Sequence, residues 1–229
     1  MNIWADLALI VGAYLFGSLP FMLALAQYRG IIDAKERRDL HLVLWYQGRR
    51  FDSGLGLFVD FAKGAIVVLS GAGLGFPLPV VAAAGVAVVC GQMWPVFLRF
   101  DGEKGNSTGL AVAVTLSWAS PSFLPLLLAL IPLAIGASIR ITAPLFHSRP
   151  LLSQRLRLSL PLGMAIGFAC LPVFSWWLGQ PVEIIFGFLA LFLVIIIRRL
   201  TAGVRDDLKT TTSKKTVMVN RLLYDRSYL

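Results

Sequence analysis

Long apolar runs separated by short polar stretches recur along the whole chain. A helix needs about 20 mainly apolar residues to cross a bilayer. The 229 residues are 57% hydrophobic and 14% charged, with a mean hydropathy of +0.77, which excludes an ordinary soluble domain. We therefore predict an all-α integral membrane protein. The pattern places about seven spans, the fourth of them short, near residues 3–26, 54–72, 77–98, 107–120, 122–140, 160–178 and 182–199.

The charges in the loops indicate how these spans are oriented. Lysine and arginine are absent from the stretches 71–79, 119–122 and 179–183, whereas the intervening loops and the C-terminal tail are basic. By the positive-inside rule, this alternation predicts an outer N-terminus, a cytoplasmic C-terminus and an odd number of spans. No basic region precedes the first apolar run, so that run is expected to remain as a spanning helix rather than a cleaved signal peptide. The expected location is the cell inner (plasma) membrane, crossed several times.

Residues 200–229 are too polar to span and are expected to form a basic cytoplasmic tail after a membrane domain of residues 1–199. Within the tail, Met218, Val219, Leu222 and Leu223 recur at helical spacing among lysines and arginines. This pattern is typical of a helix lying on an anionic inner leaflet. A disordered basic tail is the alternative. The net charge of +9 resides in short loops and in this tail, which favours membrane lipids and a phosphorylated substrate over nucleic acid as partners.

A glycine-punctuated loop connects the third and fourth apolar runs, between residues 99 and 109. Glycines allow successive N–H groups to line one concave face, and the next helix should begin near Ser107 with unpaired N–H groups. Such a helix end, with a lysine beside it, binds phosphate well. The residues expected to contact phosphate are Gly102, Lys104, Gly105, Ser107 and Thr108. The alternative is an ordinary turn in which the glycines only reverse the chain.

Polar residues also occur inside the predicted spans. Asp60 and Lys63 are three residues apart in the second span, where an unpaired charge costs several kcal/mol, so an ion pair on one helix face is expected. The pair either reaches a cytoplasmic site or only fixes helix packing. Ser18 precedes Pro20, which should free a backbone carbonyl near Phe16; a plain helix kink is the alternative. Gln92 needs a polar partner, either a substrate headgroup or another helix.

Metal and cofactor chemistry receive no support from the sequence. Cys90 and Cys170 both lie within apolar runs, and His41 and His147 lie in predicted loops far apart in sequence. None of these residues has the spacing of a metal site, so neither a metal nor another cofactor is expected.

Three stretches occur together in a distinctive order: Gly17-Ser18-Leu19-Pro20-Phe21, then Asp60-Phe61-Ala62-Lys63-Gly64, then Met93-Trp94-Pro95-Val96-Phe97-Leu98 followed by Lys104-Gly105. They resemble the bacterial acyl-phosphate:glycerol-3-phosphate acyltransferase family, the PlsY type. Arg199-Leu200-Thr201-Ala202-Gly203 is a weaker fourth match. Seven spans with an outer N-terminus are also the layout of that family.

The resemblance implies acyl transfer from acyl phosphate to the first hydroxyl of glycerol 3-phosphate, which gives lysophosphatidic acid without a metal or a CoA ester. It also implies that Gly102, Lys104, Gly105 and Thr108 bind phosphate. This suits the chemistry, because both substrates carry phosphate and the leaving group is itself phosphate.

The chain also departs from the family in two regions. The Gly-Ser-x-Asn-x-Gly-Ala-x-Asn run of the first cytoplasmic loop is absent from residues 38–48, and residues 193–196 are apolar where the family has His-Arg-Glu-Asn. In addition, Gln92 replaces a histidine, and Glu103 is expected to add negative charge beside the phosphate site. The sequence therefore leaves the catalytic residues unassigned. A second hypothesis is a non-catalytic relative that binds a phospholipid or acyl phosphate and assists another membrane enzyme, and a third is a small transporter.

Overall fold

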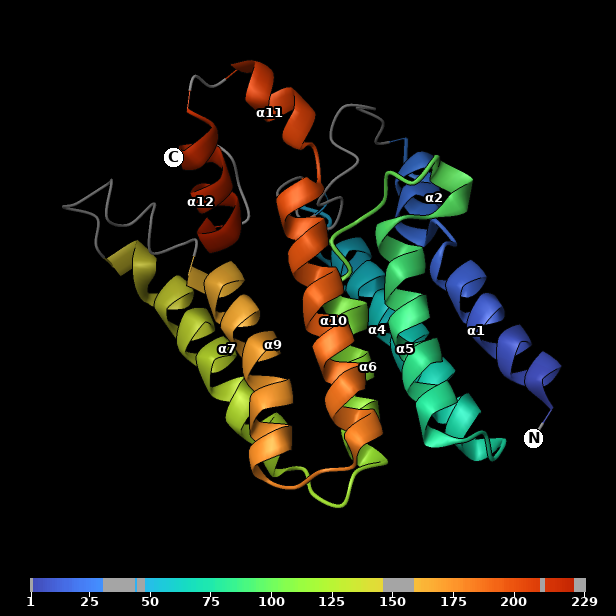
Figure 1. The fold of residues 1–229 in the computed structure, drawn as a ribbon. Helices are drawn as coiled ribbons and strands as arrows, with labels where there is room; N and C mark the ends of the chain where they lie inside the picture. The colour runs from blue at the N-terminus through green and yellow to red at the C-terminus, as the bar shows by residue number, and fades with distance from the viewer. Residues whose placement is uncertain (1, 31–43, 45–47, 146–158, 211–212, 225–229) are drawn as a thin grey trace. The chain divides into compact units, whose positions relative to one another are not determined.

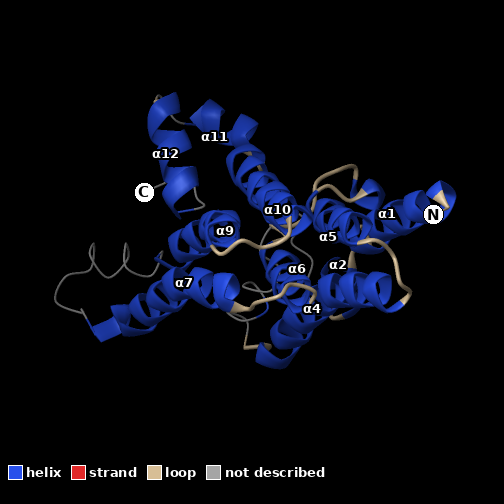
Figure 2. Ribbon diagram, turned by 60° about the horizontal axis from the view of Figure 1, so that its bottom comes forward, coloured by secondary structure: helices blue, strands red, loops and turns tan. Residues whose placement is uncertain are grey.

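The computed structural model describes residues 2–30, 44, 48–145, 159–210 and 213–224. Every regular element in this part of the chain is a helix (Figure 2). The chain divides into two compact units, Met1–Pro121 and Ser122–Leu229, which are described separately below (Figure 1).

In the first unit, the first apolar run is broken into α1 (Ile3–Gly17) and α2 (Phe21–Tyr28). The break follows from Pro20, which has no N–H to continue the helical ladder. Ser18 closes α1, because both its N–H and its hydroxyl donate to the Tyr14 carbonyl, at 3.0 and 2.8 Å. Pro20 therefore interrupts the helix fully and does not merely kink it.

The rest of the first unit consists of α4 (Arg50–Gly73), α5 (Leu78–Met93), the short 3-10 helix η1 (Val96–Leu98) and α6 (Asn106–Trp118). Helix α5 packs against α1, α4 and α6, and α4 also packs against α6. Glycines allow these close approaches. A Cβ atom on Gly91 would overlap the Tyr14 carbonyl oxygen, and one on Gly64 would lie 2.5 Å from the Thr108 carbonyl oxygen. Small residues at such crossings are typical of helix packing in membranes.

The second unit contains α7 (Leu124–Thr142), η2 (Ala143–Leu145), α9 (Ser159–Trp177), α10 (Val182–Thr201), α11 (Val204–Thr210) and α12 (Lys214–Tyr224). Helix α9 packs against both α7 and α10, and α12 packs against α9 and α10. The buried Arg199 of α10 donates to the Pro161 carbonyl of α9 at 2.7 Å, which ties the two helices together near one end.

Six helical segments among the described residues are long and apolar enough to cross a membrane: Ile3–Tyr28, Arg50–Gly73, Leu78–Leu98, Leu124–Thr142, Ser159–Trp177 and Val182–Thr201. The predicted all-α, multi-pass membrane class is thereby confirmed. The predicted fourth span corresponds to α6, which has only 13 residues and ends at Trp118, just before the Ser-Pro turn. A helix of this length is shorter than an ordinary span, so the seven-span count and the orientation of the termini remain predictions.

The glycine contact between α1 and α5 gives a stability test. Gly91→Ala should lower stability by about 2 kcal/mol, because its methyl group must push the Tyr14 backbone away. Gly12→Ala is the matched control, since a Cβ there meets nothing within 4 Å and alanine favours a helix. Thermal unfolding of the purified protein in detergent should show a lower melting temperature for Gly91→Ala only. Equal melting temperatures would contradict the close crossing.

Candidate functional site

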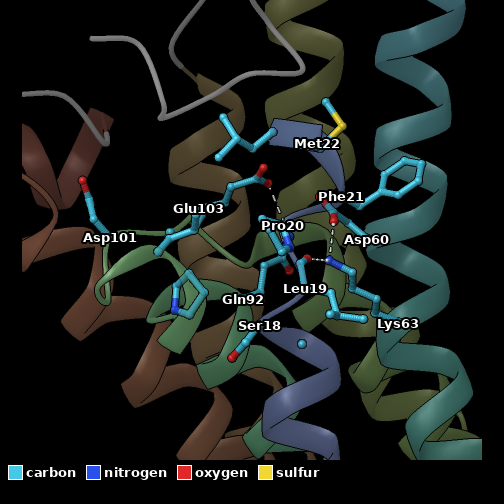
Figure 3. A pocket seen from close by; sticks show the side chains of 15 residues that line it. Ser18, Leu19, Pro20, Phe21, Met22, Asp60, Lys63, Gln92, Asp101 and Glu103 are labelled. Carbon is cyan, nitrogen blue, oxygen red and sulfur yellow. Dashed lines mark hydrogen bonds and ion pairs between the residues drawn. The ribbon is translucent and has the colours of Figure 1, made fainter. Parts of the chain in front are cut away.

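A cleft opens in the first unit where the chain passes from α1 to α2 (Figure 3). It is a small cleft that is partly open to its surroundings. Its walls come from the α1–α2 break, one face of α4, the end of α5 and the loop that leads to α6. The lining residues are Gly17, Ser18, Leu19, Pro20, Phe21, Met22, Leu23, Asp60, Lys63, Gln92, Pro95, Leu98, Asp101, Gly102 and Glu103.

Lys63 of α4 contacts the interruption between α1 and α2. Its ammonium donates to the Leu19 carbonyl at 2.8 Å and lies 3.6 Å from Asp60 Oδ1, as the dashed lines in Figure 3 show. The side chains of Lys63 and Asp60 are only 6% and 7% exposed, so each charge depends on the other for compensation. The ion pair predicted from their spacing is present. The freed carbonyl that the lysine caps is that of Leu19, not the one predicted near Phe16, because Leu19 N–H donates to Phe16 at 3.3 Å.

A second layer of polar contacts supports this wall from behind. Thr108, which is fully buried, donates its hydroxyl to the Asp60 backbone carbonyl at 2.7 Å and also contacts Gln92 Oε1. Gln92 in turn reaches the loop: its Nε2 donates to Glu103 Oε2 at 3.4 Å, and its backbone carbonyl accepts the Glu103 N–H at 3.2 Å. Gln92 thus finds its partners within the protein, on α6 and on the loop before it.

The charge state of the Glu103 carboxyl differs from the one that the sequence suggests. Burial, the charge of Asp60 and a hydrogen bond with that side chain together raise its pKa from 4.5 to about 8, against the opposing effects of Lys63 and Gln92. At pH 7 this carboxyl is therefore mostly neutral, and the expectation that it carries negative charge beside the phosphate site is wrong. A neutral carboxylic acid can donate a hydrogen bond to an anion, which a carboxylate cannot.

The predicted site residues are divided between the cleft and the adjoining turn. Ser18, Asp60, Lys63, Gln92 and Gly102 line the cleft, although the Ser18 hydroxyl is already bound to Tyr14. Thr108 lies beneath the cleft wall, as described above. Lys104, Gly105 and Ser107 do not line the cleft; Lys104 is half-buried, and Gly105 has a φ of +70° as it begins α6.

Sequence reasoning missed three contributors to the cleft: the Leu19 carbonyl, Asp101 and the neutral Glu103. Pro20 could have indicated that the Leu19 carbonyl is available, because it directly follows Leu19. The position of Glu103 between Gly102 and Gly105 could have placed it at the cleft. Its neutral state depends on neighbours on α4 and α5, which are distant in sequence. Of the first-loop stretch 38–48, where the family run is absent, only Leu44 and Gly48 belong to the described residues. Leu44 packs against Met22 and Ala26 of α2.

Within the described part of the chain, no group of three or more histidine, cysteine, aspartate or glutamate side chains could hold a metal ion. The polar side chains at the cleft instead carry one ammonium, three carboxyls, one amide and one hydroxyl. This set can orient polar substrates and exchange protons.

Comparison with known proteins decides the family. The sequence profile of the family described as "Glycerol-3-phosphate acyltransferase" matches residues 7–204, a range that contains every residue lining the cleft. The chain belongs to the glycerol-3-phosphate acyltransferase family. The predicted PlsY-type relationship is thereby confirmed, and with it a membrane protein of a phospholipid-synthesising family.

Individual relatives agree with this assignment. Glycerol-3-phosphate acyltransferase 4 of Dehalococcoides mccartyi strain CBDB1 is 30% identical, over 96% of this chain and 88% of its own length. Glycerol-3-phosphate acyltransferase 5 of another strain of that species is 29% identical, over 94% and 86%. Among solved structures, PlsY, described as an integral membrane glycerol 3-phosphate acyltransferase, in its glycerol 3-phosphate form has the same fold, with a TM-score of 0.61, 24% identity and 90% of each chain covered.

The pKa of Glu103 predicts how the stability of this family member depends on pH. The folded chain keeps the Glu103 proton up to about pH 8, whereas the unfolded chain releases it near pH 4.5. Between these values the folded state binds more protons, so this residue makes wild-type stability fall as the pH rises. Glu103→Gln keeps a neutral donor and acceptor, and should remove that fall. Melting temperatures in detergent should therefore be similar at about pH 4.5 and increasingly favour the variant towards about pH 8. Parallel curves would contradict the neutral carboxyl.

Proposed function

We propose that this protein transfers an acyl group from acyl phosphate to the first hydroxyl of glycerol 3-phosphate, giving lysophosphatidic acid. The reaction would take place at the cytoplasmic face of the inner membrane, in a chain with seven spans, an outer N-terminus and a cytoplasmic C-terminus. Family membership supports the activity, and the observation that carries it is the cleft beside Lys63. This cleft combines the buried Lys63 cation with the loop of the third family stretch. The membrane spans would allow the acyl chain to remain in the bilayer beside it.

The transfer requires one bond to form and one to break. The acceptor hydroxyl oxygen attacks the acyl carbonyl carbon, the carbon–oxygen bond to phosphate breaks, and the hydroxyl proton is released as phosphate leaves. Because the leaving group is already stable as an anion, positioning and electrostatic stabilisation can supply most of the catalysis. We assign Lys63 the role of holding negative charge in the cleft, with Asp60 and Leu19 orienting its ammonium. Glu103, neutral at pH 7, reduces the repulsion that an anionic substrate would otherwise meet.

We further propose that the turn at the start of α6 binds a substrate phosphate. The first backbone bond of this helix runs from the Gly109 N–H to the Gly105 carbonyl at 2.8 Å, so the N–H groups of residues 106–108 precede the helical ladder. Helix N-termini attract anions, and Lys104 adds a positive charge beside this one. Gly102 connects the turn to the cleft wall. In this arrangement Thr108 contributes its backbone, because its hydroxyl is committed to Asp60 and Gln92.

A second candidate function is binding of a phospholipid or acyl phosphate without transfer. It is favoured by residues 193–196, which are apolar and lie within α10, where the resemblance leads us to expect polar active-site residues. The assay below separates the two functions, since both require ligand binding and only one yields product.

An acyl-transfer assay on the purified protein tests the proposed reaction. Wild-type protein given acyl phosphate and radiolabelled glycerol 3-phosphate should form lysophosphatidic acid. Lys63→Met should lower the rate by about 100-fold or more, because it removes the cation from the cleft. Since that variant removes the positive charge beside Asp60, Asp60→Asn/Lys63→Met is included to restore folding, judged by melting temperature, without restoring activity. The matched control is Lys209→Met, at an exposed position on α11, which should retain wild-type activity. Ligand binding without product in the wild type would select the second function.

The phosphate turn has its own test. Lys104→Ala should weaken glycerol 3-phosphate binding by about 10-fold or more, measured by calorimetry, because a charge-assisted contact is lost. Lys209→Ala is the control for a general loss of positive charge. An unchanged affinity in Lys104→Ala would contradict phosphate binding at this turn.

A further inference from the structure

Helix α12 exposes an apolar face that the proposed function does not use. The helix begins at Lys214, beyond residues 7–204 that match the family profile. Met218, Val219 and Leu222 are 38%, 44% and 42% exposed. Their spacings of three and four residues place them together on one side of the helix, and Lys215 shares that side one turn earlier. Val217 and Arg221, also four residues apart, are buried on the other side.

Arg221 fixes which way this face points. Its guanidinium donates to the Ala202 carbonyl at 2.5 Å and to the Arg199 carbonyl at 3.5 Å, and it pairs with Asp207 of α11. Arg199 belongs to the last turn of α10, and Ala202 is its C-cap. Helix α12 is therefore held at the level where the last long apolar helix of the chain ends. Its buried side faces α9 and α10, which leaves the apolar side turned outward from this unit.

The surroundings of α12 indicate what covers this face. Ile197 on α10 and Ile141 near the end of α7 are 50% and 77% exposed, so large apolar side chains are exposed near the ends of both helices. Lys214 and Lys215, both exposed, add positive charge at the start of the helix. Apolar side chains next to lysines suit a position between acyl chains and anionic headgroups. We propose that α12 lies in the anionic cytoplasmic leaflet, with Met218, Val219 and Leu222 among the acyl chains and the two lysines at lipid phosphates.

The proposal is tested with a fluorescent label on the full chain in lipid nanodiscs. Leu222→Cys is labelled with an environment-sensitive dye, in a Cys90→Ala/Cys170→Ala background. The matched control is Thr216→Cys, which is also exposed but lies about 120° around the helix from Leu222. In discs rich in phosphatidylglycerol, the Leu222 label should be quenched by a lipid-borne quencher and protected from aqueous iodide. The Thr216 label should show the opposite preference.

The role of charge is tested in the same discs. Lys214→Gln/Lys215→Gln, or discs of phosphatidylcholine alone, should reduce the lipid-borne quenching at Leu222 by at least half, with melting temperature confirming that each variant is folded. Equal lipid-borne quenching in both kinds of disc would overturn the preference for anionic lipid. A Leu222 label as accessible to iodide as the Thr216 label would overturn membrane contact altogether. A label shielded from both quenchers would also overturn it, because the face would then be covered by protein, such as a second copy of this chain.

Discussion

The cleft depends on one buried ammonium. A lysine inside an apolar helix bundle is costly unless its charge and its N–H groups are compensated. Asp60 compensates the charge of Lys63, and the Leu19 carbonyl accepts one of its protons. That carbonyl is available because Pro20 interrupts the first apolar run, so the break and the lysine stabilise each other. The Thr108 hydroxyl holds the Asp60 backbone from behind, which connects α6 to the same wall. The interruption between α1 and α2 is thereby connected to the packing of two other helices, α4 and α6.

Much of this arrangement follows from sequence by simple rules. The length and polarity of the apolar runs predict the helices, and the three-residue spacing of Asp60 and Lys63 predicts their pairing. The rules fail where the partners come from distant parts of the chain. The carboxyl of Glu103 looks charged in sequence, yet in the fold it lies beside Asp60 of α4 and Gln92 of α5, and burial keeps it mostly neutral at pH 7. Likewise, Pro20 predicts a freed carbonyl, but which one is freed depends on Ser18 and Leu19, whose N–H groups bind Tyr14 and Phe16. The short fourth run, predicted near 107–120, corresponds closely to α6 (Asn106–Trp118), because the turn at Ser120 and Pro121 marks its end in the sequence.

The chain shares its backbone fold with the solved PlsY structure but carries different side chains at the cleft from those that the resemblance predicts. Glycines at helix crossings, such as Gly64 and Gly91, restrict what the backbone tolerates, because a Cβ atom at either position meets a neighbouring helix's carbonyl oxygen. Side chains at the cleft are less constrained by packing and can change while the helices stay in place. Gln92 and Glu103 illustrate this: they bind each other across the cleft wall at positions where the resemblance led us to expect other residues. A solved PlsY structure with 24% identity nevertheless shares the fold over 90% of this chain.

The central claim is that a substrate phosphate binds in the cleft beside Lys63 or at the adjoining turn that begins α6. The most direct measurement is an experimental structure of the purified protein with glycerol 3-phosphate bound. Our account predicts the phosphate within hydrogen-bonding distance, about 3 Å, of the Lys63 ammonium or of donors in the 102–108 turn. A phosphate bound elsewhere, with the Lys63 contacts to Asp60 and Leu19 unchanged and the cleft empty, would contradict it.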